Sequence, residues 1–138
     1  MPTGEWLYKL ARGDNFELKT KRGFQIGVRI MVPSYLVSSK DKETVEMYHD
    51  LPILFKKPDN LEGVHIEDVK LEDGAWRIAG VSGCLLVITG SGTTVNEARQ
   101  QVYTRIKNIM VQDMFYRTDI GLKWNTDSDR LQTWGYLY

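Results

Sequence analysis

The sequence predicts a single α+β domain, built around a strand, a glycine turn and a capped helix over Gly83–Ile109. Three observations support this fold class. The run Cys84–Ile88 is apolar without a break, which is typical of a central strand covered on both faces. Thr94 and Glu97 have the spacing of a capping box, which begins a helix. Shorter strand patterns lie between turn residues, and 138 residues make one ordinary domain.

The first half of the chain predicts a short helix, several strands and a long loop. Residues 4–12 place apolar side chains on one helix face, and Gly13 marks the end of that helix. The segment Ser34–Pro52 is polar and predicts an exposed loop, with a turn of helix around residues 44–48. Strands are expected at Glu17–Thr20, Gln25–Val32 and Ile53–Phe55. The second of these is the clearest, because apolar residues alternate along it until Pro33 ends it.

The second half predicts a hairpin, a central strand and one long helix. Strands are expected at Val64–Leu71, Ala75–Gly80 and Gly83–Thr89. A glycine turn over Thr89–Thr93 then leads into a helix at about residues 94–109. Apolar residues recur along this helix at helical spacing, so one stripe faces the sheet. The domain is expected to span residues 1–121, and residues 122–138 are interpreted either as an appended segment or as a partly disordered tail.

Charge and cysteine content narrow the class of function. Eighteen basic and eighteen acidic residues give a net charge of zero, so neither nucleic acid nor an anionic membrane is an expected partner. The short basic runs at residues 19–22 and 56–57 are interpreted as solvated turn flanks. Cys84 is the single cysteine, which favours a reducing, cytoplasmic setting. No signal peptide or membrane span is predicted.

The side chains that carry chemistry form no recognisable catalytic set. The glycine turn lacks the third glycine of a dinucleotide motif and the lysine of a P-loop, so a structural turn is favoured over a phosphate site. Cys84 lies in a strand predicted to be buried, and His49 and His65 lie far apart in the sequence. The carboxylates between residues 62 and 73 match no calcium loop and predict a solvated hairpin.

The segment Phe115–Gly121 is the most informative polar stretch. If it is extended, the side chains of Arg117 and Asp119 point to the same face. They could then pair with each other and pin the chain end, or contact an anionic ligand. The sequence favours neither alternative over the other.

Taken together, these segments resemble the C-terminal domain of phosphoribosylamine–glycine ligase (glycinamide ribonucleotide synthetase), a member of the ATP-grasp superfamily. The resemblance is carried by Gly83–Arg99, Lys107–Ile109 and Met114–Gly121, where residue order and spacing agree together. It is weaker over Leu7–Ala11 and Gly27–Val32. The resemblance implies a β-rich antiparallel half-barrel, a rudimentary barrel-sandwich hybrid, with one long amphipathic helix packed on it.

That family joins glycine to phosphoribosylamine in purine biosynthesis, using ATP and a divalent Mg²⁺ or Mn²⁺ ion. The resemblance implies that the N-terminal and ATP-grasp domains of a parent enzyme are the partners of this chain. Those domains would hold the ATP and the metal ion, so no cofactor is expected in this chain and no catalysis by the chain alone. The long 34–52 segment and Thr118 depart from the family pattern, which bears on the acceptor substrate.

The resemblance also implies site residues at the substrate or at the domain interface. These are Pro33, Tyr35, Tyr116, Arg117 and Asp119. Pro33 and Tyr35 are expected at the rim of the active site. Arg117 and Asp119 are expected to fix the domain against its neighbours or to lie near a substrate phosphate. No metal ligand and no catalytic residue is assigned.

Two other functions compete with this one. A binding or interaction module of the same fold would explain the unusual 34–52 segment and the aromatic residues of the tail, among them Trp134 and Tyr136. A small independent enzyme would have to use Cys84 or His49.

Overall fold

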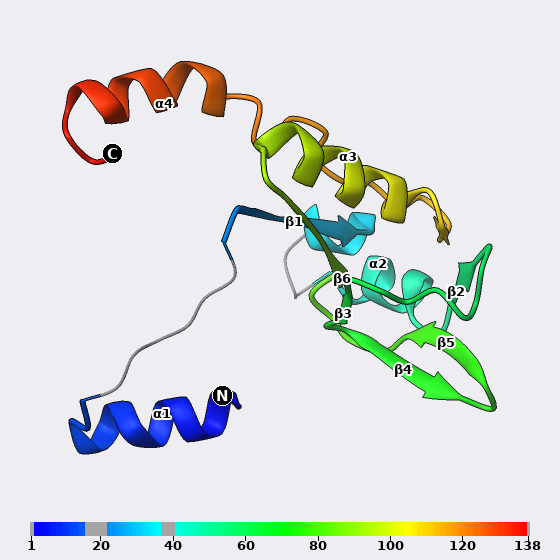
Figure 1. Cartoon of the computed structure of the whole chain (residues 1–138). Helices are drawn as coiled ribbons and strands as arrows, with labels where there is room; N and C mark the ends of the chain where they lie inside the picture. The colour runs from blue at the N-terminus through cyan, green and yellow to red at the C-terminus, as the bar shows by residue number, and fades with distance from the viewer. Residues whose placement is uncertain (1, 16–21, 37–40, 138) are drawn as a thin grey trace.

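The computed structural model of the chain describes residues 2–15, 22–36 and 41–137. Figure 1 shows a mixture of helices and antiparallel strands, so the predicted α+β class is confirmed. The helices are α1 (Thr3–Arg12), the 3-10 helix η1 (Pro33–Leu36), α2 (Lys42–Tyr48), α3 (Val95–Ile106) and α4 (Trp124–Thr133). The strands are β1 (Phe24–Met31), β2 (Pro52–Phe55), β3 (Val64–Ile66), β4 (Val69–Glu72), β5 (Ala75–Ile78), β6 (Cys84–Gly92) and β7 (Ile109–Met110).

The strands divide between two open sheets. One has three strands in the order β1-β6-β3, and the other has four in the order β4-β5-β2-β7. The prediction that β6 is central is confirmed, because β1 and β3 pair with it on either side. The expected half-barrel is not seen, because the described strands form two sheets and neither of them closes. Helix α3 packs on β6 and β1, and the core lies between these elements and β2 and β5.

The predicted strand over Val64–Leu71 is wrong as a single element, because it belongs to both sheets. On the side of the three-stranded sheet, the N–H of Glu67 donates to the carbonyl of Leu85, and the N–H of Asp68 donates to the carbonyl of Cys84, both on β6. From Asp68 onward the partner is β5, since the N–H of Ala79 donates to the carbonyl of Asp68. The chain therefore passes from one sheet to the other at this residue.

Strand β6 runs to Gly92, so the predicted glycine turn is wrong. Both glycines near its end lie against α3, and they are needed for close packing rather than for a turn. A Cβ atom on Gly90 would lie 2.6 Å from the backbone nitrogen of Val102, and one on Gly92 would lie 2.7 Å from that of Ala98. Only a residue without a side chain lets the helix approach the strand this closely.

The capping box of α3 is confirmed in both halves. Thr94 accepts a hydrogen bond from the N–H of Glu97, and the Glu97 carboxylate accepts one in return from the N–H of Thr94. The predicted apolar stripe is buried as far as Ile106, where the helix ends. The predicted end at residue 109 is too late, because Ile109 begins β7 and pairs with Phe55.

Removing the cap is expected to weaken the domain. Thr94→Ala should lower the free energy of unfolding by about 1 kcal/mol, because the N–H of Glu97 loses its side-chain acceptor. The same substitution at Thr104, an exposed residue within α3, should change it by no more than about 0.5 kcal/mol. Urea denaturation of both variants measures the difference, and equal effects would contradict the role given to the cap.

The described part of the segment 34–52 contains a helix where a turn of helix was predicted, around residues 44–48, and a second helix that was not predicted. Residues 33–36 form η1, and α2 begins at the side chain of Asp41, which accepts from the N–H of Thr44. Tyr48 is buried, and its hydroxyl donates to Asp113 over 3.1 Å. This segment is therefore attached to the body of the domain at both ends.

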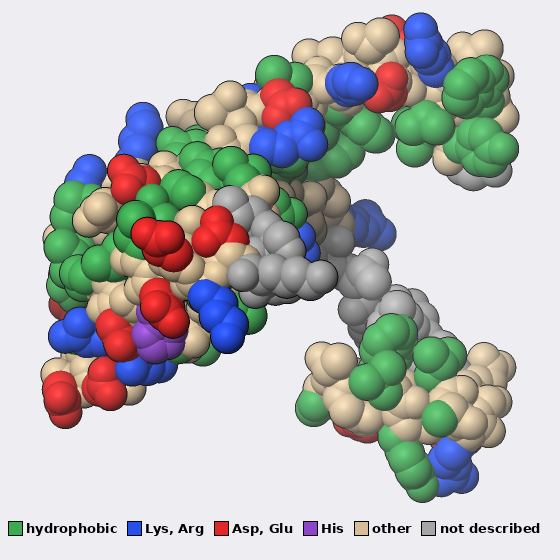
Figure 2. All heavy atoms as spheres, turned by 180° about the vertical axis from the view of Figure 1, so that it is seen from behind, with side chains coloured by type: hydrophobic (Ala, Val, Ile, Leu, Met, Phe, Trp, Pro, Cys, Tyr) green, Lys and Arg blue, Asp and Glu red, His purple; other side chains and the backbone are tan. Residues whose placement is uncertain are grey.

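The two ends of the chain carry helices. The predicted first helix is confirmed, and Gly13 ends it with φ 69°. The strand predicted at Glu17–Thr20 lies outside the described residues. The described part of the tail contains α4, and Trp124 packs edge-on against Phe24 with ring centroids 5.0 Å apart. Figure 2 shows hydrophobic side chains exposed on both terminal helices. None of the described helices has the length and apolar character needed to cross a membrane.

Candidate functional site

Two of the predicted site residues meet in one surface hollow. Tyr35 and Arg117, far apart in the sequence, line it together with Arg29, and its volume is about 320 Å³. We call it the arginine hollow. Its lining residues are Gly27, Val28, Arg29, Met31, Tyr35, Arg117 and Ile120. The floor is the outer face of β1, and the walls are η1 and the segment that follows β7.

Tyr35 is positioned by a close contact between η1 and the start of β6. Its N–H donates to the carbonyl of Val32 over 2.9 Å, and the N–H of Val32 donates to Gly83 over 2.9 Å. Gly83 has φ 70°, and a Cβ atom there would lie 2.6 Å from the side-chain oxygen of Ser34. The Tyr35 side chain itself is 42% exposed, so it is available to a ligand or a neighbouring domain.

Arg117 is positioned by backbone contacts on either side of it. Phe115 and Met31 exchange two backbone hydrogen bonds, of 2.8 and 3.0 Å, which fix the segment beside β1. The hydroxyl of Tyr103 on α3 donates to the carbonyl of Arg117 over 2.9 Å. Arg99 donates to the carbonyls of Thr118 and Ile120. Helix α3 thus holds the backbone while the Arg117 side chain stays exposed.

The predicted pairing of Arg117 with Asp119 is present and bidentate. Nε donates to Oδ1 over 2.9 Å, and a terminal nitrogen donates to Oδ2 over 2.6 Å. The carboxylate raises the pKa of Arg117, and the guanidinium lowers the pKa of Asp119. A guanidinium has five N–H donors, so the pair orients Arg117 and leaves donors for a further acceptor. Both alternatives from the sequence therefore remain compatible with this geometry.

Comparison with known proteins shows the family of the chain. The family described as "Phosphoribosylglycinamide synthetase, C domain" matches residues 39–123, which include Arg117 and Asp119. The chain belongs to this family.

Relatives of the chain carry the same family name. Phosphoribosylamine–glycine ligase of Helicobacter pylori is 30% identical over 115 residues, which cover 82% of this chain and 25% of that protein. The ligase of Clostridium acetobutylicum is 40% identical over 53 residues, which cover 38% of this chain and 12% of that protein. The chain therefore spans about a quarter of the length of the Helicobacter relative.

A solved structure shares the fold. The crystal structure of phosphoribosylamine–glycine ligase from Thermotoga maritima superposes with a TM-score of 0.62 at 23% identity. The match covers 82% of this chain and 26% of that chain. The arrangement of two open sheets, with α3 packed on the three-stranded one, is thus the fold of a phosphoribosylglycinamide synthetase C domain.

The other predicted site residues lie near the arginine hollow, but they do not line it. Pro33 begins η1 at the rim. Tyr116 turns to the opposite side from Arg117 and packs against Tyr103, with ring centroids 6.3 Å apart. Sequence analysis did not assign Arg29, although its place on the exposed face of an alternating strand, beside Gly27, was a usable signal.

Several other ionisable groups of this synthetase C domain are engaged in separate interactions. Glu62 pairs with Arg105, and Asp68 accepts from the N–H of Ser82 over 2.8 Å. His49 contacts Asp50 over 3.0 Å, and His65 contacts the hydroxyl of Thr89 over 3.1 Å. Within the described ranges, no three His, Cys, Asp or Glu side chains are grouped so that they could hold a metal ion. Of the carboxylates in the acidic hairpin, Glu62 and Glu72 therefore form ion pairs, and Asp68 accepts a backbone hydrogen bond.

Cys84 lies at the start of β6 and is 4% exposed. Burial, and then the neighbouring Glu67, raises the pKa of the thiol from its usual 9.0 to about 12. Because the folded state keeps this proton to a higher pH than the unfolded chain, the contribution of the thiol to stability is complete below pH 9. It is lost as the pH rises towards about 12.

We expect Cys84 to react slowly while the domain is folded. The raised pKa predicts roughly 1,000-fold less thiolate than in the unfolded chain at pH 8, and burial slows access further. Iodoacetamide labelling followed by mass spectrometry, with and without guanidinium chloride, measures both rates. Equal rates in the two conditions would contradict the buried, protonated thiol and would reopen the hypothesis of a cysteine enzyme.

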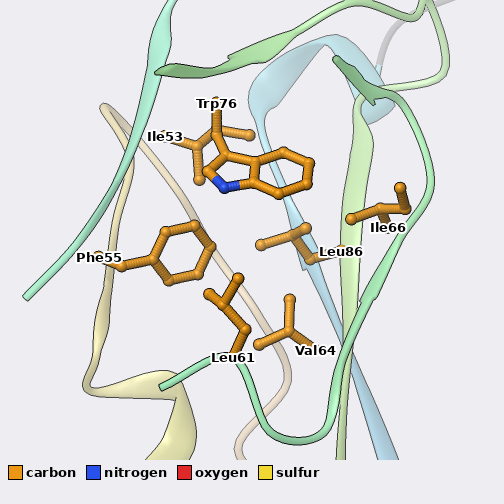
Figure 3. Close-up of a pocket in the computed structure, with 7 residues that line it drawn as sticks. All are labelled: Ile53, Phe55, Leu61, Val64, Ile66, Trp76 and Leu86. Atoms are coloured by element: carbon orange, nitrogen blue, oxygen red, sulfur yellow. The ribbon is translucent and has the colours of Figure 1, made fainter. Parts of the chain in front are cut away.

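An apolar gap separates the two sheets on another side of the domain. Figure 3 shows Ile53, Phe55 and Trp76 from the four-stranded sheet facing Leu86 and Val64 from the three-stranded sheet. The gap has a volume of about 90 Å³. It is much smaller than the few hundred Å³ of a typical ligand pocket, so we interpret it as a packing gap where the two sheets meet.

Proposed function

We propose that this chain acts as the C-terminal accessory domain of a phosphoribosylamine–glycine ligase-like enzyme, and that the arginine hollow forms part of the wall of its active site. The observation that carries the proposal is that Arg29, Tyr35 and Arg117 line one hollow. Family membership supports the assignment, and the whole enzyme's reaction is the ATP-dependent joining of glycine to phosphoribosylamine.

The chemistry of the hollow suits an anionic substrate group. Two guanidinium groups line it, and guanidinium binds phosphate oxygens through parallel N–H···O bonds. Asp119 holds Arg117 in one orientation, which reduces the entropy that a ligand must overcome when it binds. The hydroxyl of Tyr35 adds one donor at the rim. We therefore assign the hollow to the phosphate of the acceptor substrate.

The rest of the reaction belongs to other parts of a parent enzyme. We propose that ATP and the Mg²⁺ or Mn²⁺ ion bind to its ATP-grasp and N-terminal domains, in the cytoplasm. This chain would contribute binding and orientation only. By itself it is expected to release no ADP from ATP in the presence of magnesium, glycine and phosphoribosylamine, and turnover by the isolated chain would overturn the accessory role.

A chimeric ligase tests the hollow directly. In the Helicobacter pylori enzyme, this chain replaces the matching 25% of the protein, and glycine-dependent ADP release is measured. Arg117→Ala should lower kcat/KM by about 30-fold, because a charged hydrogen bond to phosphate is lost. Arg130→Ala, on the exposed face of α4, is the matched control and should have no effect. A folded chimera without activity, or equal losses in the two variants, would contradict the proposal.

An interaction module is the second candidate, and the exposed aromatics of the tail favour it. Trp134 is 65% exposed and Tyr136 is 73% exposed. If this function holds, immobilised chain should capture a partner other than an ATP-grasp protein, and Trp134→Ser should abolish the capture. Retention of the partner by that variant would exclude the tail as its binding surface.

A further inference from the structure

A second hollow, separate from the arginine hollow, gathers basic side chains at the C-terminal end of α3. The loop after β2 forms one wall, the last turn of the helix forms the other, and the volume is about 270 Å³. We call it the lysine hollow. Its polar lining includes Lys56, Lys57, Asn60, Arg105, Lys107 and Asn108. The sequence alone predicts a solvated turn flank at Lys56 and Lys57, because nothing in it places these two lysines beside Lys107.

Asn108 ties the two walls together. Its side-chain oxygen accepts from the N–H of Lys57 over 2.7 Å, and its side-chain nitrogen donates to the carbonyls of Lys57 and Asn60. Its own carbonyl accepts from the N–H of Lys56 over 2.9 Å. The backbone that carries the lysines is therefore fixed against the helix, although their side chains are exposed.

Arg105 forms the base of the lysine hollow and is already engaged. Its side chain is 17% exposed, and it donates to the carbonyl of Thr89 over 2.6 Å and to the carboxylate of Glu62. By contrast, among the described residues no carboxylate lies within 4.0 Å of the ammonium group of Lys56, Lys57 or Lys107. These three charges are available to a ligand.

The positive charge that lines the lysine hollow exceeds what the C-terminal end of α3 requires. The C-terminus of a helix carries roughly half a negative charge, which one nearby cation offsets. Among the described residues that line this hollow, four are basic (Lys56, Lys57, Arg105 and Lys107) and one, Glu62, is acidic. A concave site with a surplus of ammonium groups, which act as point charges, suits a compact anion of high charge.

We propose that the lysine hollow binds a soluble phosphoryl-bearing anion, and that two adjacent phosphoryl groups bind more tightly than one. Lys57 and Lys107 line the hollow from its two walls, and the proposed diphosphate contacts both. Asn60 and Asn108 keep the walls at a fixed spacing through the hydrogen bonds described above. The site is independent of the arginine hollow, so either proposal can fail alone.

The test uses the whole chain labelled with ¹⁵N and titrated with inorganic pyrophosphate or inorganic phosphate at constant ionic strength. We expect saturable shifts of the backbone amides of Lys57, Asn60, Lys107 and Asn108, with tighter binding of pyrophosphate. Lys107→Glu should raise the Kd by about 10-fold, since it replaces an attractive charge with a repulsive one. Lys123→Glu, an exposed lysine next to α4, should leave the Kd unchanged.

Several results would overturn the proposal. One is that pyrophosphate shifts these amides no more than sodium chloride at the same ionic strength. Equal weakening by Lys107→Glu and Lys123→Glu would also overturn it, as would shifts confined to residues around Arg29 and Arg117. Far-UV circular dichroism checks that both variants are folded. Lys57→Glu, at an exposed position on the other wall, provides a second variant and should weaken binding to a similar extent.

Discussion

Gly90→Ala is expected to lower the free energy of unfolding by about 3 kcal/mol. The added Cβ atom would lie 2.6 Å from the backbone nitrogen of Val102 and against the carbonyl of Ala98, so α3 has to move away from β6. Both of these neighbours are backbone atoms, which cannot move aside by changing rotamer. The loss of free energy of unfolding should therefore reach the upper end of the range for overpacked cores. Thermal unfolding should report a lower Tm, and urea denaturation measures the free energy.

Gly27→Ala is the matched control, because it also adds a Cβ atom to a strand glycine in the same sheet. Gly27 lies on β1, opposite Thr89 of β6. A Cβ atom there meets only the Val87 side chain, at an ordinary 3.5 Å. The substitution should change the free energy of unfolding by no more than about 0.5 kcal/mol. If both variants lose the same free energy, close approach of the helix is not the reason for glycine at position 90.

Gly83→Ala should also destabilise the domain by about 3 kcal/mol, and it should disturb the arginine hollow as well. The residue has a left-handed backbone with φ 70°, and its Cβ atom would clash with the backbone of Ser34 and Tyr35. Relief of that clash requires η1 to shift, which moves Tyr35. Urea denaturation measures the first effect, and amide chemical shifts of residues 34–36 measure the second.

Gly74→Ala separates backbone strain from the clash. Gly74 has a similar φ of 76°, but a Cβ atom there would have no atom within 4 Å. This variant should lose only about 1 kcal/mol, the cost of a side chain in the left-handed region. A loss at Gly83 no greater than at Gly74 would mean that η1 is not held by the contact with β6.

The parts of the fold that depend on local pattern were predictable from the sequence. Thr94 and Glu97 make contacts within one turn of helix, so their spacing determines where α3 begins. Alternation in β1 correctly predicted its buried face, with Ile26, Val28 and Ile30 inside. The spacing of Arg117 and Asp119 left two alternatives open, and the structure contains one of them, the pair.

The parts that depend on distant partners could not be predicted. Gly90 and Gly92 were interpreted as a turn, because glycine is equally suitable for a turn and for a close helix, and only α3 distinguishes the two. The passage of the chain between sheets at Asp68 is set by its partners on β5 and β6. The end of α3 is determined by β2, which pairs with Ile109 and draws the chain into the other sheet.

The pairing of β1 with β6 has a consequence for how the nascent chain folds. Every described partner of β1 in this sheet lies between Cys84 and Gly92. After β1 is made, the ribosome must add roughly 60 further residues, which takes about 3 to 12 seconds at ordinary elongation rates. Throughout that time β1 lacks its partner strand in this sheet, and its apolar side chains lack their contacts with β6. A slower synthesis of residues 32–92 would therefore lengthen the exposure of these side chains.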